Sequence, residues 1–242
     1  MRYIRSQSPL IITLLFLLQG QCGFAQKEVK GSLAAEVVQK QELGYLLSVP
    51  QKTKEKKPLI VFLHGSGEKG TDTEKLKIHG PLKYIQNHKL DAYILAPQCP
   101  ENDYWNAEAL YQLILKIQKE NDIDPNRIYL TGLSMGGWGA WNLAIAHPDM
   151  FAALVPICGF VDRVPMIENC KLAAIPTHIF HGLLDDVVSV DYATAIYKKI
   201  KACPNAKIEL TIFDDANHDA WTRVYDHPEI YQWMLGQTKT QH

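Results

Sequence analysis

The sequence lacks an apolar run long enough to cross a lipid bilayer as a helix, which takes about 20 residues. Leu10–Leu18 is apolar but too short, and no later segment reaches that length. Two arginines precede this stretch, and the small residues Gly23 and Ala25 follow it, which is the pattern of a secretory signal peptide. We therefore expect residues 1–25 to be removed and the protein to be secreted or periplasmic, with no stable membrane span. Lipoprotein processing at Cys22 is the alternative, disfavoured because a glutamine precedes that cysteine where a small residue is expected.

The chain also lacks an excess of charge of either sign. Without the two leader arginines, the 25 basic residues fall to 23 against 26 acidic ones, a net charge of −3. Such a balance attracts neither nucleic acid nor an anionic membrane surface, so we expect neither as a partner. Removing 25 residues from 242 leaves 217, which suffice for one domain over residues 26–242.

Cysteine is scarce, and no two cysteines have the C-x-x-C spacing of a zinc or redox site. An oxidising compartment would permit one or two disulfides, and buried free thiols are an equal alternative. His178 and His181 are three positions apart on a predicted strand and face opposite sides, so they do not chelate one metal ion. We predict no metal or organic cofactor. Beyond the leader the cysteines are Cys99, Cys158, Cys170 and Cys203.

Seven short runs rich in Val, Ile and Leu predict strands buried on both faces of a parallel sheet. They are residues 45–49, 59–64, 92–96, 127–131, 152–158, 177–181 and 207–213. Helical periodicity predicts helices at residues 106–121, 190–203 and 227–236. A further helix is expected at residues 136–147, after the glycine-flanked serine. This alternation predicts an α/β fold: a single domain with a mostly parallel central sheet, helices on both faces and no large lid. We expect the charged stretch 51–57 to be a hairpin loop between the first two strands.

A serine with glycines on both sides follows the predicted strand 127–131. Gly132, Ser134 and Gly136 form a G-x-S-x-G sequence between a strand and a helix, which is the context of a nucleophile elbow. That turn strains the backbone of the serine, and side chains at the flanking positions would clash with the neighbouring strand and helix. A chance match in a glycine-bearing turn is the alternative, and we favour Ser134 as a nucleophile.

A serine hydroxyl is a weak nucleophile near neutral pH, so it needs a base and a group that orients the base. Asp185 and Asp186 follow one predicted strand and His218 follows the next, in the order Ser, Asp, His of the α/β-hydrolases. Each would lie at the carboxyl end of a strand, where open α/β sheets gather their chemistry. We interpret three further acids near His218 as solvated loop residues: Asp214, Asp215 and Asp219.

The glycines of "HGSGEKG" also match the dinucleotide fingerprint G-x-G-x-x-G. That motif requires a helix at the glycines and an acidic residue after the second strand. Here the segment breaks off at Gly80, and Asp91 precedes the next strand instead of following it. Lysine is also missing after Gly70, where a phosphate-binding P-loop requires it. We therefore exclude both nucleotide motifs.

Six segments together resemble small secreted serine esterases of the α/β-hydrolase superfamily, in the carboxylesterase, dienelactone hydrolase and feruloyl-esterase-like group that includes predicted phospholipases and peptidases. They lie between Leu59 and Trp221 and are specific for fold and triad but not for substrate. The resemblance implies a triad of Ser134, Asp185 and His218, since the family pattern H-G-x-x-D matches Asp185 and not Asp186. The segments are "VFLHGSGEKGTD", "LAPQCPENDYW", "TGLSMGGWGAW", "VPICG", "IFHGLLDDVV" and "DANHDAW".

The same resemblance implies an oxyanion hole formed by the backbone N–H groups of Ser66 and Met135. Trp105 and Trp221 lie next to site motifs, and we predict that they line the substrate cleft. We interpret Trp138, on the helix after the serine, as a packing residue.

We therefore expect an exported serine hydrolase that cleaves carboxylic esters through an acyl-enzyme, on small-molecule or polysaccharide-linked substrates such as acyl or feruloyl esters. The short connection between "VPICG" and "IPTHIF" leaves no room for a multi-helix cap, so the cleft should be open. One alternative is a prolyl-oligopeptidase-like peptidase, although 217 residues leave no room for a gating domain. Another is a noncatalytic carbohydrate-binding member of the fold, although such proteins commonly lose a triad residue.

Overall fold

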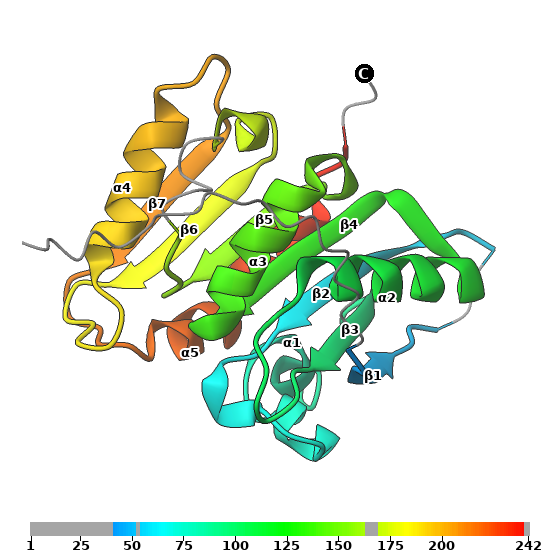
Figure 1. Cartoon of the computed structure of the whole chain (residues 1–242). Coiled ribbons are helices and arrows are strands. Elements are labelled where there is room, and N and C mark those ends of the chain that lie inside the picture. Colours follow the sequence, from blue (N-terminus) through cyan, green and yellow to red (C-terminus); the bar gives the residue numbers. More distant parts are fainter. Residues whose placement is uncertain (1–40, 52–53, 163–168, 240–242) are drawn as a thin grey trace, which may run out of the picture. The chain divides into compact units, whose positions relative to one another are not determined.

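A seven-stranded sheet forms the centre of the computed structural model, which describes residues 41–51, 54–162 and 169–239 (Figure 1). The strands are β1 (Gly44–Ser48), β2 (Lys57–Leu63), β3 (Tyr93–Gln98), β4 (Ile123–Leu133), β5 (Ala153–Ile157), β6 (Thr177–Gly182) and β7 (Ile208–Phe213). Their order across the sheet is β1-β3-β2-β4-β5-β6-β7, and all neighbours are parallel except β1 and β3. The predicted fold class is confirmed. The predicted signal peptide lies outside the described residues.

The expected hairpin between the first two strands is wrong. β1 pairs with β3, and β2 lies between β3 and β4. Six of the seven residues of β2 are buried, so this strand needs a neighbour on each edge, whereas β1 is partly exposed along its length. A half-exposed strand suits the edge of the sheet, where only one neighbour covers it.

The described residues contain six α-helices, four between strands and two after the last strand. They are α1 (Gly80–Tyr84), α2 (Ala107–Glu120), α3 (Met135–Ala146), α4 (Val190–Lys201), α5 (Ala220–Tyr225) and α6 (Pro228–Leu235). Of the four helices that were predicted, α2, α4 and α6 show helical periodicity, and α3 was expected from the serine motif that precedes it. α1 and α5 are too short to show periodicity. Side-chain caps set three of the starts: Asn106 accepts a hydrogen bond from the Ala109 N–H, Ser189 accepts one from the Asp191 N–H, and Asp219 caps α5 in the same way.

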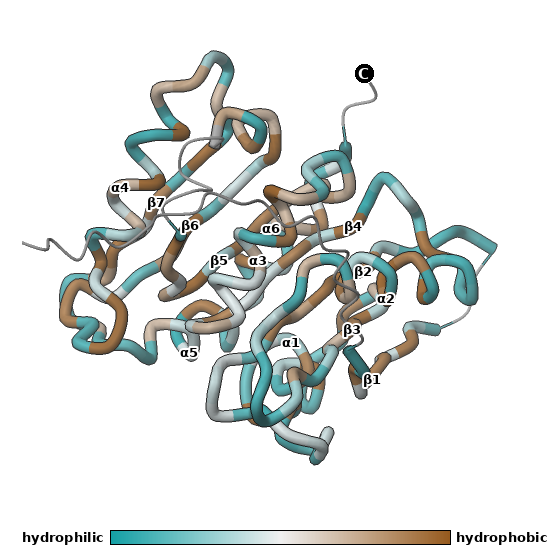
Figure 2. Tube along the Cα trace, viewed as in Figure 1, coloured by the Kyte–Doolittle hydropathy of each residue, from teal (hydrophilic) through white to brown (hydrophobic). Residues whose placement is uncertain are grey.

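The helices cover both faces of the sheet. Alternate residues of β2 point to opposite sides: Leu59 and Val61 pack in the core under α2, α3 and α4, whereas Ile60 and Phe62 pack in the core under α1, α5 and α6. Figure 2 shows hydrophobic stretches along the central strands. Within the described residues, every helix is too short or too polar to cross a membrane.

One disulfide joins Cys170, just before β6, to Cys203, just after α4, with a Cα–Cα distance of 5.7 Å. Cys99 and Cys158 are free and buried. The structure thus contains both outcomes that the sequence left open for the four cysteines.

Candidate active site

Ser134 occupies the sharp turn between β4 and α3, with φ 52° and ψ −119°. A positive φ is uncommon outside glycine and is held only where the surroundings enforce it. The close packing around the turn supplies that constraint, because a side chain at Gly136 would collide with the Leu63 carbonyl and one at Gly132 with the Gly136 carbonyl. The two glycines therefore allow β2, β4 and α3 to meet directly beneath Ser134.

Ser134, His218 and Asp185 are brought together from three separate loops at the carboxyl ends of β4, β7 and β6. The distance from Ser134 Oγ to His218 Nε2 is 2.9 Å, and that from His218 Nδ1 to Asp185 Oδ2 is 2.8 Å. Because Nδ1 faces a carboxylate, it carries the proton and donates it, which leaves Nε2 free to accept the Ser134 hydroxyl. This geometry lets the imidazole take a proton from the serine.

Asp185, and not its neighbour Asp186, faces His218. The side chain of Asp185 is 0 % exposed, and its Oδ1 accepts hydrogen bonds from the backbone N–H groups of Val187 and Val188. Burial acts to raise the pKa of Asp185, but the hydrogen bonds from His218, Val188 and Val187 together outweigh it and hold the pKa below its usual value. Asp185 is therefore a carboxylate at neutral pH, whereas Asp186 is exposed to solvent.

Two of the other acids near His218, Asp215 and Asp219, form hydrogen bonds with other groups. Asp215 forms two hydrogen bonds with the Arg223 guanidinium, at 2.6 and 3.0 Å. Asp219 accepts a hydrogen bond from the Thr222 N–H and so caps α5.

The two candidate oxyanion donors lie at the starts of neighbouring helices. Ser66 begins a 3-10 helix (Ser66–Glu68) and Met135 begins α3, so neither N–H has a partner within its own helix. The preceding Gly65 packs against the elbow, since an added Cβ there would lie 2.8 Å from Leu133 Cδ1. Gly65 N–H donates to the buried Glu68 carboxylate at 2.9 Å. This contact holds the loop after β2 beside the serine turn, and sequence reasoning did not single out Glu68.

His64 and Trp105 support that loop from below. His64 Nε2 accepts the Cys99 N–H at 3.0 Å, so the proton lies on Nδ1, which donates to the Gly65 carbonyl. Burial lowers the pKa of His64 to about 4, so the ring is neutral at neutral pH. Trp105 is only 4 % exposed and donates from Nε1 to the His64 carbonyl. The structure places Trp105 in the core instead of the substrate cleft, because this ring fills the space above Gly139.

Trp221 lies beside the proposed base. Its ring meets the imidazole of His218 edge to face at 5.0 Å and that of His79 at 5.8 Å. The ring is partly exposed, and its buried Nε1 has no hydrogen-bond partner in the described residues. This position is compatible with the predicted role of Trp221 in lining the cleft.

A row of aromatic rings near the elbow was not predicted as a unit. Tyr104, Trp138, Phe160 and Tyr192 follow one another at centroid distances of 6.1, 5.8 and 6.3 Å. Trp138 was expected only to pack, but it is partly exposed and its Nε1 donates to the Asp162 carboxylate. The loop after β6, which carries Asp185, also exposes hydrophobic side chains: Leu183, Leu184 and Val187 are all at least half exposed. Exposed apolar surface of this kind commonly marks a binding site.

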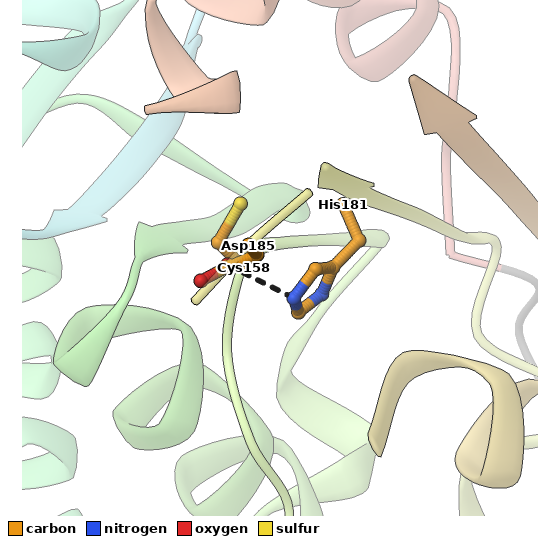
Figure 3. Close-up of side chains that lie close together, drawn as sticks. All are labelled: Cys158, His181 and Asp185. Atoms are coloured by element: carbon orange, nitrogen blue, oxygen red, sulfur yellow. Dashed lines mark ion pairs between the residues drawn. The ribbon is translucent and has the colours of Figure 1, made fainter. Parts of the chain in front are cut away.

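Cys158 and His181 lie next to Asp185, and one potential ligand atom of each of the three residues lies within 4.8 Å of the others (Figure 3). His181 Nε2 is 2.8 Å from the Val188 carbonyl oxygen, so it carries a hydrogen there and offers no lone pair. Burial raises the pKa of the Cys158 thiol to about 12, which keeps it protonated. The cluster therefore serves as a hydrogen-bonded support for Asp185.

Comparison with known proteins identifies an esterase family. A family model described as phospholipase/carboxylesterase matches residues 96–227, more than half of the chain. The poly(3-hydroxyalkanoate) depolymerase C of Paucimonas lemoignei is 29% identical over 119 residues, which are 42% of this chain and 28% of that protein. The bifunctional acetylxylan esterase/xylanase XynS20E of Neocallimastix patriciarum is 31% identical over 99 residues, 39% of this chain and 14% of that protein. The chain thus spans less than a third of either relative.

Solved structures agree with the fold. A thermostable esterase is 31% identical, with a TM-score of 0.71 over 81% of this chain and 60% of that one. A ferulic acid esterase, at 18% identity, has a TM-score of 0.59 over 80% of this chain and 90% of that one.

Proposed function

The chain belongs to the phospholipase/carboxylesterase family of α/β-hydrolases, and from that premise we propose that it hydrolyses carboxylic esters through an acyl-enzyme on Ser134. The two hydrogen bonds that link Ser134 to His218 and His218 to Asp185 carry this proposal. They give a weak nucleophile a base within reach and give that base a fixed orientation.

In the acylation half, Ser134 Oγ attacks the ester carbonyl carbon while its proton passes to His218 Nε2. The carbonyl oxygen becomes an oxyanion, which accepts hydrogen bonds from the N–H groups of Ser66 and Met135. Asp185 stabilises the imidazolium that forms. The tetrahedral species then collapses: the bond from carbon to the alcohol oxygen breaks, and His218 gives its proton to that leaving oxygen.

In the deacylation half, water takes the place of the alcohol. His218 Nε2 accepts a proton from the water as its oxygen attacks the acyl carbon, and a second oxyanion forms at the same position. Collapse breaks the bond to Ser134 Oγ, which regains its proton from His218, and the carboxylic acid leaves. Each oxyanion donor in such a site contributes roughly 100- to 1,000-fold to the rate.

The surroundings of the triad support an ester carried on a bulky or aromatic group. One member of the aromatic row, Trp138, lies one helical turn after the nucleophile, because its backbone N–H donates to the Ser134 carbonyl. The other members of the row are Tyr104, Phe160 and Tyr192. Aromatic rings with polar tips suit the flat faces and hydroxyl edges of sugars and of feruloyl groups. We propose acyl or feruloyl esters on polysaccharide as the substrate class, in line with the names of the acetylxylan esterase relative and the ferulic acid esterase structure.

We further propose that the protein works outside the cytoplasm. The sequence pattern of a signal peptide over residues 1–25 supports this proposal, and so does the disulfide between Cys170 and Cys203, which is a feature of oxidising compartments. Expression of the full chain with sequencing of the exported product tests it. A mature N-terminus at Gln26 is expected, and retention of the intact leader in the cytoplasm would contradict it.

The catalytic proposal is tested with a fluorophosphonate probe and a substrate panel. The wild-type protein should be labelled at Ser134 and should cleave acetyl, butyryl or feruloyl esters, whereas folded Ser134→Ala should be unlabelled and slower by several orders of magnitude. Cleavage of proline-containing peptide amides in preference to esters would favour a peptidase instead. A folded wild-type protein that neither reacts with the probe nor cleaves any ester would indicate a noncatalytic binder.

A further inference from the structure

His181 is the last but one residue of β6, and its side chain is completely buried beneath the acid loop, residues 183–189. Its Nε2 lies 2.8 Å from the Val188 carbonyl oxygen. The same nitrogen lies 3.1 Å from Asp185 Oδ2, the ion pair that is dashed in Figure 3. Both of these partners accept hydrogen bonds, so Nε2 must carry the hydrogen. The neutral ring is therefore the Nε2–H tautomer, with its lone pair on Nδ1.

The other nitrogen of this ring has no hydrogen-bond partner in the described part of the chain. His181 Nδ1 is buried and makes no hydrogen bond with any residue that the structure describes. A buried polar atom without a partner costs about 1–3 kcal/mol. An apolar side chain at this position would avoid that cost. The Nε2–H therefore has to make stabilising contacts that an apolar side chain could not make.

The contacts of Asp185 show what the Nε2–H provides. Asp185 Oδ1 accepts the N–H groups of Val187 and Val188, and Oδ2 accepts His218 Nδ1. His181 reaches the same Oδ2 and also the carbonyl of Val188. The Nε2–H thus hydrogen-bonds one end of the short turn, at Val188, and lies 3.1 Å from the carboxylate at its other end, at the oxygen that the backbone N–H groups of Val187 and Val188 do not contact.

We propose that His181 is a positioning residue for the catalytic acid: its Nε2–H donates to the Val188 carbonyl and lies at ion-pair distance from Asp185 Oδ2, and so holds the acid loop in the conformation that turns the carboxylate toward His218. This inference rests on the proposed serine esterase function of the same site. His181 touches neither Ser134 nor a substrate, and it acts only through Asp185. Release of the turn would let the carboxylate rotate away from the imidazole, and a displacement of about 1 Å at a catalytic group can cost roughly 100-fold in rate.

Three variants of His181 separate the hydrogen bond from the space that the ring fills. His181→Gln keeps an N–H donor near the position of Nε2, whereas His181→Leu and the more adaptable His181→Met remove the donor. His178→Met is the matched control, because His178 lies on the same strand and bonds to Thr211 on the opposite face of the sheet. Turnover of a small aryl ester, thermal melting and fluorophosphonate labelling are measured for each variant.

The expected kinetic result is a split between kcat and KM. The Leu and Met variants should lose roughly 10- to 100-fold in kcat with little change in KM, the Gln variant should stay within about 5-fold of wild type, and the control should be unchanged. Folded Leu or Met variants with wild-type kcat would overturn the inference. A wild-type protein that hydrolyses no ester would instead overturn the proposed function, which keeps the two failures distinct.

A measurement on the wild-type protein alone covers the case in which the apolar variants do not fold. Nitrogen-15 spectra of the histidine rings at neutral pH report which ring nitrogen carries the hydrogen. His181 should be the Nε2–H tautomer, with that hydrogen slow to exchange with water. A hydrogen on Nδ1 alone would leave nothing to donate to Asp185 and Val188, and it would overturn the inference regardless of catalytic activity.

Discussion

Acid should destabilise the fold through one buried imidazole, that of His64. Burial lowers the pKa of His64 from 6.5 to about 4, and a second proton would have to sit on Nε2, which already accepts the Cys99 N–H. The unfolded chain therefore binds this proton at a higher pH than the folded chain. The stability that the neutral ring provides is intact above pH 6.5 and is lost as the pH falls toward 4. From pH 7 to pH 4.5 the loss is about 2.5 kcal/mol, because each pKa unit corresponds to about 1.4 kcal/mol.

The assay compares the wild-type protein with His64→Gln by urea unfolding at pH 7, 6, 5 and 4.5. Glutamine offers an acceptor near the position of Nε2 but does not titrate. Groups that titrate in both proteins cancel in the difference, including His178, whose pKa burial also lowers. The stability advantage of the wild type should shrink by about 2.5 kcal/mol across this range. An advantage that is constant from pH 7 to pH 4.5 would refute the reasoning.

Three further predictions follow from contacts around the site and the core. Asp185→Asn should reduce kcat on a small ester roughly 10,000-fold in a folded protein, while Asp186→Asn changes it little; equal effects would reject the assignment of the acid. Gly136→Ala should destabilise the fold by about 3 kcal/mol in urea unfolding, because its methyl group would collide with the Leu63 carbonyl. Replacing both Cys170 and Cys203 by alanine removes a disulfide between residues 33 positions apart. This should lower the free energy of unfolding by about 3.5 kcal/mol and the melting temperature by roughly 10 °C. An unchanged melting temperature would show that the link does not constrain the unfolded chain.

Much of the fold was predictable because its strands are buried on both faces. Continuous apolar runs such as residues 59–64 and 152–158 show up in sequence without any knowledge of their neighbours. The order of the strands in the sheet cannot be read from the sequence in this way, because strand pairing is decided by contacts between distant segments. The placement of β1 beside β3 depends on how exposed each strand can remain, and no local pattern encodes that.

The candidate site was predictable where its backbone conformation requires particular residue types, such as glycine. Gly132 and Gly136 mark the elbow, and the chain order of acid and histidine narrows the remaining candidates. The burial of Trp105 was not predictable, because a tryptophan beside a site motif can equally line a cleft or fill the space above a glycine. The tautomers of His64 and His181 depend on single carbonyl and N–H groups elsewhere in the fold, which sequence alone does not locate.

The two unpaired cysteines in the described residues, Cys99 and Cys158, have a practical consequence for work on this protein. Burial raises the pKa of Cys99 to about 11 and that of Cys158 to about 12, so neither supplies the thiolate that alkylating reagents require. Among the cysteines that the structure describes, one introduced at the surface would therefore be the only one to react in the native state. Fluorescent or spin labels could then be attached at a chosen point beside the candidate active site, with Cys99 and Cys158 left in place.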